Sequence, residues 1–204
     1  MKHNTLEVSQ LHPDYLGFIF YEHSPRNFEG TIPEIPSAIK KVGVFVNASE
    51  SFVLETVNSR GLDIVQLHGE ESPDYCRSLM AGFAKDGTEV KLWKVFSIKE
   101  TFDTQLLTPY VSLVDKFLFD TKDVLKGGTG RTFNWKALEC YEIPTPIVLS
   151  GGIGLEQVNA LKRFLEMGLP IEVIDVNSKF EFEPGHKDVS KLRQFVAELG
   201  LPKK

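Results

Sequence analysis

The sequence predicts an α/β fold built on a parallel sheet, and three observations lead to this prediction. Short apolar segments typical of buried strands alternate along the chain with segments of helical periodicity. Polar residues or glycines follow nearly every apolar segment. No linker, low-complexity stretch or change of composition divides the 204 residues. We therefore expect a single domain that spans residues 1–204.

Seven segments are expected to be strands because they are apolar, short and bounded by turn or helix signals. Helical patterns lie between them: residues 51–57 open on a serine cap, a second helix begins at Ser72 with Pro73 at its first position, and Gly200 ends the last helix. In chain order the expected strands are 16–20, 42–46, 64–68, 90–96, 117–120, 147–150 and 173–176, and the other helical patterns are 155–161 and 188–199.

Two architectures fit this alternation, an open doubly wound sheet and a closed (β/α)8 barrel. His68, Asp120, the run Ser150-Gly151-Gly152 and Asp175 all stand at the ends of predicted strands. A barrel gathers such residues around one mouth, whereas an open sheet spreads them along an edge, so the pattern favours the barrel.

The start of the chain does not fit a complete barrel. Residues 4–11 have the pattern of a helix capped by Asn4, and this helix precedes the first predicted strand. Because seven strands are recognisable rather than eight, the predicted fold class is an α/β TIM barrel that lacks its first β-strand.

The composition of the chain bears on which kinds of molecule the protein could bind. The net charge is −5, which favours neither nucleic acid nor an anionic membrane surface. No apolar run has the length of a membrane span, and the N-terminus has no apolar signal core. Cys76 and Cys140 match no metal-ligand spacing and are expected to be packing residues. We expect a cytoplasmic protein that binds no metal.

Asp120 is the leading candidate for chemistry. It ends a strand and is followed by the glycine-rich loop 126–133, which we expect to close over a substrate. A carboxyl group at a strand end is a candidate acid or base. It could instead cap the next helix or pair with Lys122 or Lys126.

Two loops near the end of the chain are candidates for binding phosphate. Residues 150–154 follow a strand and open a helix, and glycines there allow backbone N–H groups to approach an anion. Residues 175–179 would be the partner loop, as in other barrels. A tight turn is the alternative for Gly151-Gly152. Arg26 suits a carboxylate or phosphate but could be an ordinary exposed arginine, and His68 could be a structural histidine.

Taken together, these motifs resemble the phosphoribosylanthranilate isomerase family of tryptophan biosynthesis, over almost the whole chain. The segments that carry the resemblance are 17–21 with 24–26, 42–47, Gln66-Leu67-His68-Gly69-Glu70, Asp120 with 127–130, 150–153, 175–178 and 184–188.

The resemblance implies an aldose–ketose isomerase that performs an Amadori rearrangement. The substrate would be N-(5-phosphoribosyl)anthranilate and the product 1-(2-carboxyphenylamino)-1-deoxyribulose 5-phosphate. A general acid protonates the ribose ring oxygen, and a general base then removes the proton from C2. No cofactor is implied, and the partner is a phosphorylated small molecule rather than nucleic acid or a membrane.

The resemblance also implies roles for individual residues. Asp120 matches the general acid, Arg26 the group that meets the anthranilate carboxylate, and His68 and Asp175 the ribose side of the pocket. Lys179 departs from the glycine that many members carry, and could either add charge to the phosphate pocket or point to solvent. The phosphate loops are matched by Gly151, Gly152, Asn177 and Ser178.

The family's general base is a cysteine that ends the first strand, in a Lys-Ile-Cys-Gly or Lys-Val-Cys-Gly pattern. This pattern is not in the chain, and Met1-Lys2-His3 aligns just beyond it. Either the start was placed downstream of the true one, or the chain is a shortened relative. We expect impaired activity, lower stability than a complete barrel, and a monomer or a homodimer formed through the exposed edge.

Two alternative functions remain. One is a different enzyme on the same phosphate-binding barrel, such as a ribulose-phosphate epimerase, for which the metal-ligand pattern is poor. The other is a non-catalytic relative that binds a sugar phosphate.

Overall fold

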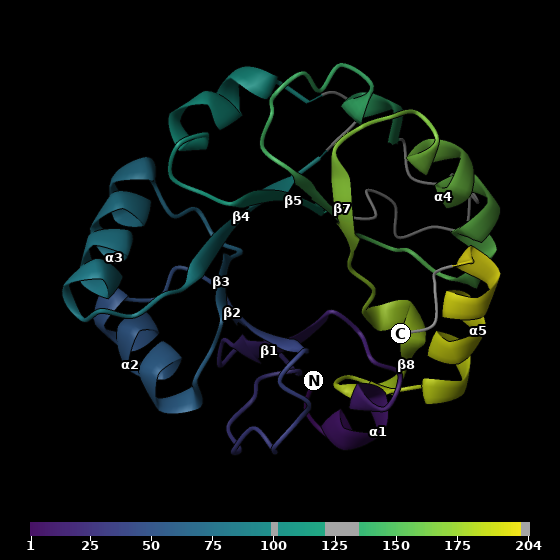
Figure 1. Ribbon diagram of the computed structural model, residues 1–204, viewed down its shortest axis with the longest axis horizontal. Coiled ribbons are helices and arrows are strands. Elements are labelled where there is room, and N and C mark those ends of the chain that lie inside the picture. The colour runs from purple at the N-terminus through teal and green to yellow at the C-terminus, as the bar shows by residue number, and fades with distance from the viewer. Residues whose placement is uncertain (99–101, 121–134, 201–204) are drawn as a thin grey trace.

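The computed structural model describes residues 1–98, 102–120 and 135–200. Seven parallel strands form one sheet in chain order. The sheet curls into a ring with the helices outside it (Figure 1). The seven predicted strands are therefore confirmed. They are β1 (Tyr15–Phe20), β2 (Lys40–Phe45), β3 (Ile64–Leu67), β4 (Lys91–Ser97), β5 (Lys116–Asp120), β6 (Ile147–Leu149) and β7 (Ile171–Ile174).

The connections between strands are mostly helical. The predicted helix 155–161 is a 3₁₀ turn that leads into an α-helix, and the connections after β4 and β5 contain further 3₁₀ turns. The α-helices are α1 (Thr5–Ser9), α2 (Glu50–Arg60), α3 (Pro73–Lys85), α4 (Val158–Leu165) and α5 (Val189–Leu199). The 3₁₀ turns are η1 (Thr104–Tyr110), η2 (Trp135–Leu138), η3 (Leu155–Gln157) and η4 (Ser178–Phe180). None of the helices among the described residues is long and apolar enough to cross a membrane.

The helix boundaries follow local capping chemistry. The Ser72 hydroxyl accepts a hydrogen bond from the Tyr75 N–H at the start of α3, with Pro73 at the first position as predicted. Gly200 adopts a φ of 79° and ends α5, also as predicted. Helix α2 begins slightly earlier than expected because Ser49, rather than Ser51, is its N-cap.

Asn4 precedes α1 as predicted, but it does not cap that helix. Its side-chain amide accepts from the Lys187 N–H at 3.0 Å and donates to the Lys187 carbonyl at 2.9 Å. Lys187 lies in β9 (His186–Lys187), which forms an antiparallel hairpin with β8 (Glu181–Glu183). This hairpin was not predicted. The expectation of a side-chain cap at Asn4 was therefore wrong: the amide ties the N-terminal segment to the hairpin instead.

The sheet buries a different set of side chains on each face. Outward side chains pack against the helices in the larger core, and include Phe45, Leu67 and Phe119. Inward side chains form a second, smaller cluster within the curl of the sheet. That cluster consists of Val42, Ile64, Trp93, Val95, Leu118 and Val148, with Tyr15 and Val173 packed against it.

In the part of the chain that is described, no strand joins β7 to β1, so the ring is open there. The free edge of β1 is partly covered, because Phe28 N–H donates to the Ile19 carbonyl at 2.7 Å and the Met1 nitrogen donates to the Gly17 carbonyl. Figure 1 shows the N-terminus in this opening, beside α1 and β8. The prediction of a barrel lacking one strand is confirmed.

Candidate active site

Polar side chains converge where β3, β5, β6 and β7 end. Side chains alternate between the two faces of a strand, so a residue an even number of positions after an inward residue also faces inward. The four strand-end residues meet this condition, and we call the region where they face inward the mouth. They are His68 after Ile64, Asp120 after Leu118, Ser150 after Val148 and Asp175 after Val173.

His68 and Asp120 form a pair at the mouth. The His68 Nε2 lies 3.4 Å from Asp120 Oδ2, and the side chains are 32% and 22% exposed. The backbone holds His68 in place, since its N–H donates to the Phe45 carbonyl at 2.7 Å. The pair is thus fixed by its strands yet open to a ligand. The alternative partners Lys122 and Lys126, and the loop 126–133, lie outside the described residues.

Asp175 and Ser150 form a second pair from neighbouring strands. The Ser150 hydroxyl donates to Asp175 Oδ2 at 2.9 Å. Burial raises the pKa of Asp175 above its ordinary value, although the Ser150 hydrogen bond and the Lys187 charge act in the opposite direction. The Asp120 carboxylate raises this pKa further, which places the two carboxyl groups in one electrostatic environment.

The raised pKa of Asp175 implies that this residue makes the stability of the folded chain depend on pH. A carboxyl group whose folded pKa exceeds its unfolded value favours folding at low pH, and this contribution is lost as the pH rises through the folded pKa. Asp175→Asn should therefore raise the melting temperature at pH 7 by a few degrees, since about 1 kcal/mol moves a chain of this size by roughly 2–4 °C. The gain should shrink by pH 4. Thermal melts at both values test this.

The control for that experiment is Asp74→Asn in α3, because the Asp74 side chain is 90% exposed. Its melting temperature should follow that of the unmodified chain at both pH values. A destabilised Asp175→Asn variant at pH 7 would contradict the prediction.

Arg26 lies in the connection after β1 and is already paired. Its Nε donates to Glu181 Oε1 at 3.1 Å and to Oε2 at 2.9 Å, and its Nη2 donates to Oε2 at 2.6 Å. Glu181 also accepts from Lys187 Nζ at 3.0 Å. Burial alone would raise the pKa of Glu181, but the hydrogen bond from Arg26, together with the charge and hydrogen bond of Lys187, lowers it to about 2. Burial lowers the pKa of Lys187, against the pull of Glu181.

In the first of the two predicted phosphate loops, two glycines adopt backbone angles in the left-handed region. Gly151 and Gly152 adopt φ values of 89° and 63°, which L side chains rarely take. The loop leads into η3 rather than directly into an α-helix. On the partner loop, Asn177 and Ser178 are exposed, and the Asn177 side-chain oxygen accepts from Lys187 Nζ.

Lys179 stands where the resemblance predicts a glycine. Its Nζ lies 3.4 Å from Glu156 Oε1, and its side chain is 48% exposed. It therefore links the loop after β7 to the turn after β6 at the molecular surface.

The two cysteines take different positions. Cys76 is buried in α3 as expected, and burial raises its pKa to about 11. Cys140 is exposed, so its predicted role as a packing residue was wrong, because η2 ends before it and leaves it at the surface. Among the described residues, no group of three or more His, Cys, Asp or Glu side chains could hold a metal ion.

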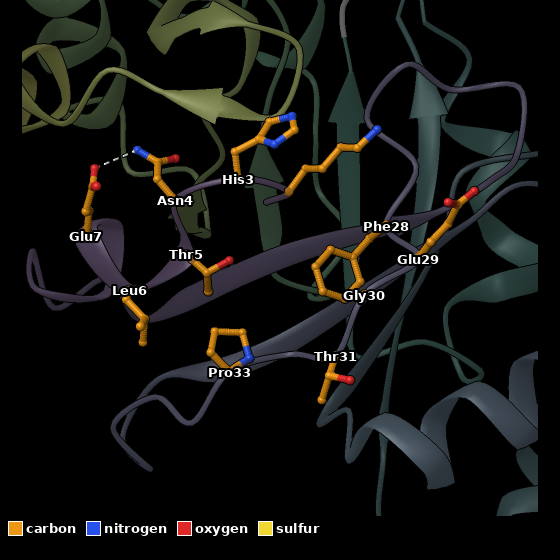
Figure 2. A pocket seen from close by; sticks show the side chains of 11 residues that line it. His3, Asn4, Thr5, Leu6, Glu7, Phe28, Glu29, Gly30, Thr31 and Pro33 are labelled. Carbon is orange, nitrogen blue, oxygen red and sulfur yellow. Dashed lines mark hydrogen bonds between the residues drawn. The ribbon is translucent and has the colours of Figure 1, made fainter.

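Two open cavities lie beside β1, and neither is lined by the four strand-end residues. One, of about 620 Å³, is lined by residues 2–7, by residues 28–31 and by Pro33 (Figure 2). Asn4 and Glu7 face each other there through a 3.1 Å hydrogen bond. The other, of about 730 Å³, lies at the ends of β1 and β2. Neither cavity is lined by His68, Asp120 or Asp175. The candidate active site is therefore identified by its paired polar side chains and not by the volume of a cavity.

Glu181 and Lys187 are polar residues beside Arg26 that were not predicted as site residues, although Lys187 lies in the segment 184–188 that carries the resemblance. Each is nearly buried, with side chains 4% and 8% exposed, yet each lies in a polar segment that looks like surface. The turn residues Pro184 and Gly185 were the available signal for a hairpin. They do not indicate that the hairpin folds back toward Arg26.

Comparison with known proteins gives a consistent result. The family model for N-(5'-phosphoribosyl)anthranilate (PRA) isomerase matches residues 2–198. The chain is 40% identical over 205 residues to an N-(5'-phosphoribosyl)anthranilate isomerase of Parabacteroides distasonis, which covers 98% of this chain and 89% of that protein.

Solved structures agree with the sequence comparison. A phosphoribosyl anthranilate isomerase from Thermotoga maritima superposes with a TM-score of 0.81 and 27% identity, covering 98% of this chain and 95% of that one. Another solved phosphoribosyl anthranilate isomerase, in complex with reduced 1-(o-carboxyphenylamino)-1-deoxyribulose 5-phosphate, has a TM-score of 0.76 and 26% identity, covering 97% of this chain and 92% of that one.

Proposed function

Because this chain belongs to the N-(5'-phosphoribosyl)anthranilate isomerase family, we propose that its mouth catalyses the Amadori rearrangement of N-(5-phosphoribosyl)anthranilate. The product is 1-(2-carboxyphenylamino)-1-deoxyribulose 5-phosphate, an intermediate of tryptophan biosynthesis. The observation that carries the proposal is the convergence of the His68–Asp120 and Ser150–Asp175 pairs on one mouth.

Asp120 is the general acid in this proposal. Its proton passes to the ribose ring oxygen as the bond from that oxygen to C1 breaks, which leaves an iminium ion at C1. His68, 3.4 Å away, orients the carboxyl group and stabilises the carboxylate that remains. A base then removes the C2 proton, and the resulting enol-amine tautomerises to the ketone.

The phosphate and the ribose occupy the ends of β6 and β7. Gly151 and Gly152 direct backbone N–H groups at the phosphate, with Asn177 and Ser178 on the facing loop. Asp175 contacts the ribose hydroxyls, held by its hydrogen bond to Ser150. Arg26 receives the anthranilate carboxylate.

Loss of the N-(5-phosphoribosyl)anthranilate fluorescence tests the activity. We expect the chain to accelerate the decay above the spontaneous rate, with carboxyphenylamino-deoxyribulose phosphate as the product identified by chromatography. A rate equal to the spontaneous one, with no binding of the reduced product analogue, would refute the proposed function.

A specific observation favours slow turnover by the chain of residues 1–204. Cys76 is buried in α3 outside the ring, and Cys140 is exposed beyond η2, so neither thiol faces Asp120 across the mouth. The second candidate function is thus a protein that binds the sugar phosphate without turning it over. Tight binding of the reduced product analogue together with spontaneous-rate decay would support this candidate.

The guanidinium of Arg26 is expected to contribute to the affinity for the ligand. Arg26→Ala removes the cation that meets the ligand carboxylate, so it should weaken binding of the reduced product analogue about 30-fold, equivalent to about 2 kcal/mol. Isothermal titration calorimetry measures the change. Arg60→Ala is the control, because the Arg60 guanidinium bonds the Gly30 carbonyl at the exposed surface. Equal affinities for Arg26→Ala and the unmodified chain would contradict the prediction.

We propose a cytoplasmic protein that is a monomer or a homodimer, with the open edge between β7 and β1 as the contact in the dimer. Sedimentation equilibrium distinguishes the two oligomeric states.

A further inference from the structure

The bond between Arg26 and Glu181 uses one particular edge of the guanidinium. Nε and Nη2 both donate to the Glu181 carboxylate, while no bond from Nη1 to another described residue is present. A guanidinium carries five N–H donors in a planar fork and can engage a second carboxylate on its remaining edge. The Arg26 side chain is 24% exposed, so Arg26 is not sealed from solvent by its pairing with Glu181.

We propose that Glu181 is a positioning residue that fixes Arg26 for recognition of the substrate carboxylate. This inference rests on the proposed function. Arginine has a long side chain that loses rotamer freedom on binding, and a bidentate bond made in advance removes that loss from the binding step. Glu181 thus acts through Arg26 and not on the reacting atoms.

Lys187 prevents Glu181 from cancelling the charge of Arg26. Its Nζ lies 3.0 Å from Glu181 Oε1, and the Glu181 and Lys187 side chains are 4% and 8% exposed. The three side chains together carry one net positive charge. An anionic ligand group is therefore still attracted after Arg26 has been paired.

The hairpin that carries Glu181 is itself fixed. Gly185 N–H donates to Glu181 Oε1 at 3.1 Å, and the Gly185 carbonyl accepts from the N–H groups of Lys2 and His3 at 3.1 Å each. Asn4 bonds both backbone groups of Lys187. Hydrogen bonds at the hairpin turn and at Lys187 therefore hold the segment that carries Glu181 in place, as a positioning group requires.

The same hairpin provides a matched control. Glu183 lies two positions from Glu181, but its side chain is 66% exposed, and its one ion-pair partner among the described residues is His186, at 3.5 Å. Glu181→Gln and Glu183→Gln make the same chemical change on one strand. Only the first removes a charge that contacts Arg26.

The first measurement uses the free protein. The Arg26 Nε–Hε resonance should show slow exchange and a rigid heteronuclear NOE in the unmodified chain and in Glu183→Gln. In Glu181→Gln both properties should be lost while the melting curve stays cooperative. A rigid Arg26 in Glu181→Gln would overturn the proposal, whether or not the chain is an isomerase.

The second measurement compares two ligands, the reduced product analogue and the same compound without its ring carboxylate. Glu181→Gln should weaken the first about 10-fold and the second less than about 2-fold. In an Arg26→Ala background it should weaken neither. Equal losses for both ligands, or a full 10-fold loss in the Arg26→Ala background, would overturn the positioning role. No binding of either ligand by the unmodified chain would refute the proposed function.

Discussion

Adding Lys-Val-Cys-Gly directly before Met1 is expected to raise isomerase turnover about 10³-fold, the range in which a positioned base contributes to a rate. The added residues would extend the chain from Met1, whose nitrogen bonds the Gly17 carbonyl, into the opening between β1 and β7. That places a thiol on the side of the mouth opposite Asp120. The rate of fluorescence loss from N-(5-phosphoribosyl)anthranilate measures the effect.

The control is the same extension with serine in place of cysteine. Both extensions pair the free edges of the sheet, so both should raise the melting temperature. The cysteine version alone should gain turnover, because a hydroxyl is a far weaker base than a thiolate. Equal turnover by the two extended chains would show that the base lies elsewhere.

The second large effect is expected at Asp120. In the cysteine-extended chain, Asp120→Asn should lower kcat about 10³-fold, because asparagine keeps the shape of the side chain but has no carboxylic proton to give. Affinity for the reduced product analogue should change less than about 3-fold, because binding this ligand involves no proton transfer from Asp120. Steady-state kinetics and titration calorimetry separate the two quantities.

Asp74→Asn in the same extended chain is the control, since its exposed side chain lies in α3, away from the mouth. It should leave both kcat and affinity unchanged. An Asp120→Asn variant that keeps at least a third of its kcat would exclude Asp120 as the general acid.

The sheet could be predicted from the sequence because each strand is a local apolar run with a polar residue at its end. A barrel gathers its strand ends around one mouth, so His68, Asp120 and Asp175 could be grouped from the sequence. Helix α3 was equally accessible, because Ser72 and Pro73 signal its start locally.

The contacts of Arg26 could not be predicted, because they join segments far apart in the chain. Arg26 and Glu181 are 155 positions apart, and the bond depends on a short hairpin held by Asn4. Asn4 was misassigned for the same reason. A side chain that caps a helix and one that bonds a distant strand have the same local sequence, and tertiary packing decided between them.

The identity of the ligand site is tested most directly by titrating the 204-residue chain with reduced 1-(o-carboxyphenylamino)-1-deoxyribulose 5-phosphate and following backbone amide resonances. We expect saturable shifts at Gly69, Gly152, Asp175 and Ser178, which follow β3, β6 and β7 at the mouth. Shifts confined to the cavity between α1 and residues 28–33, or no shifts at all, would contradict this expectation.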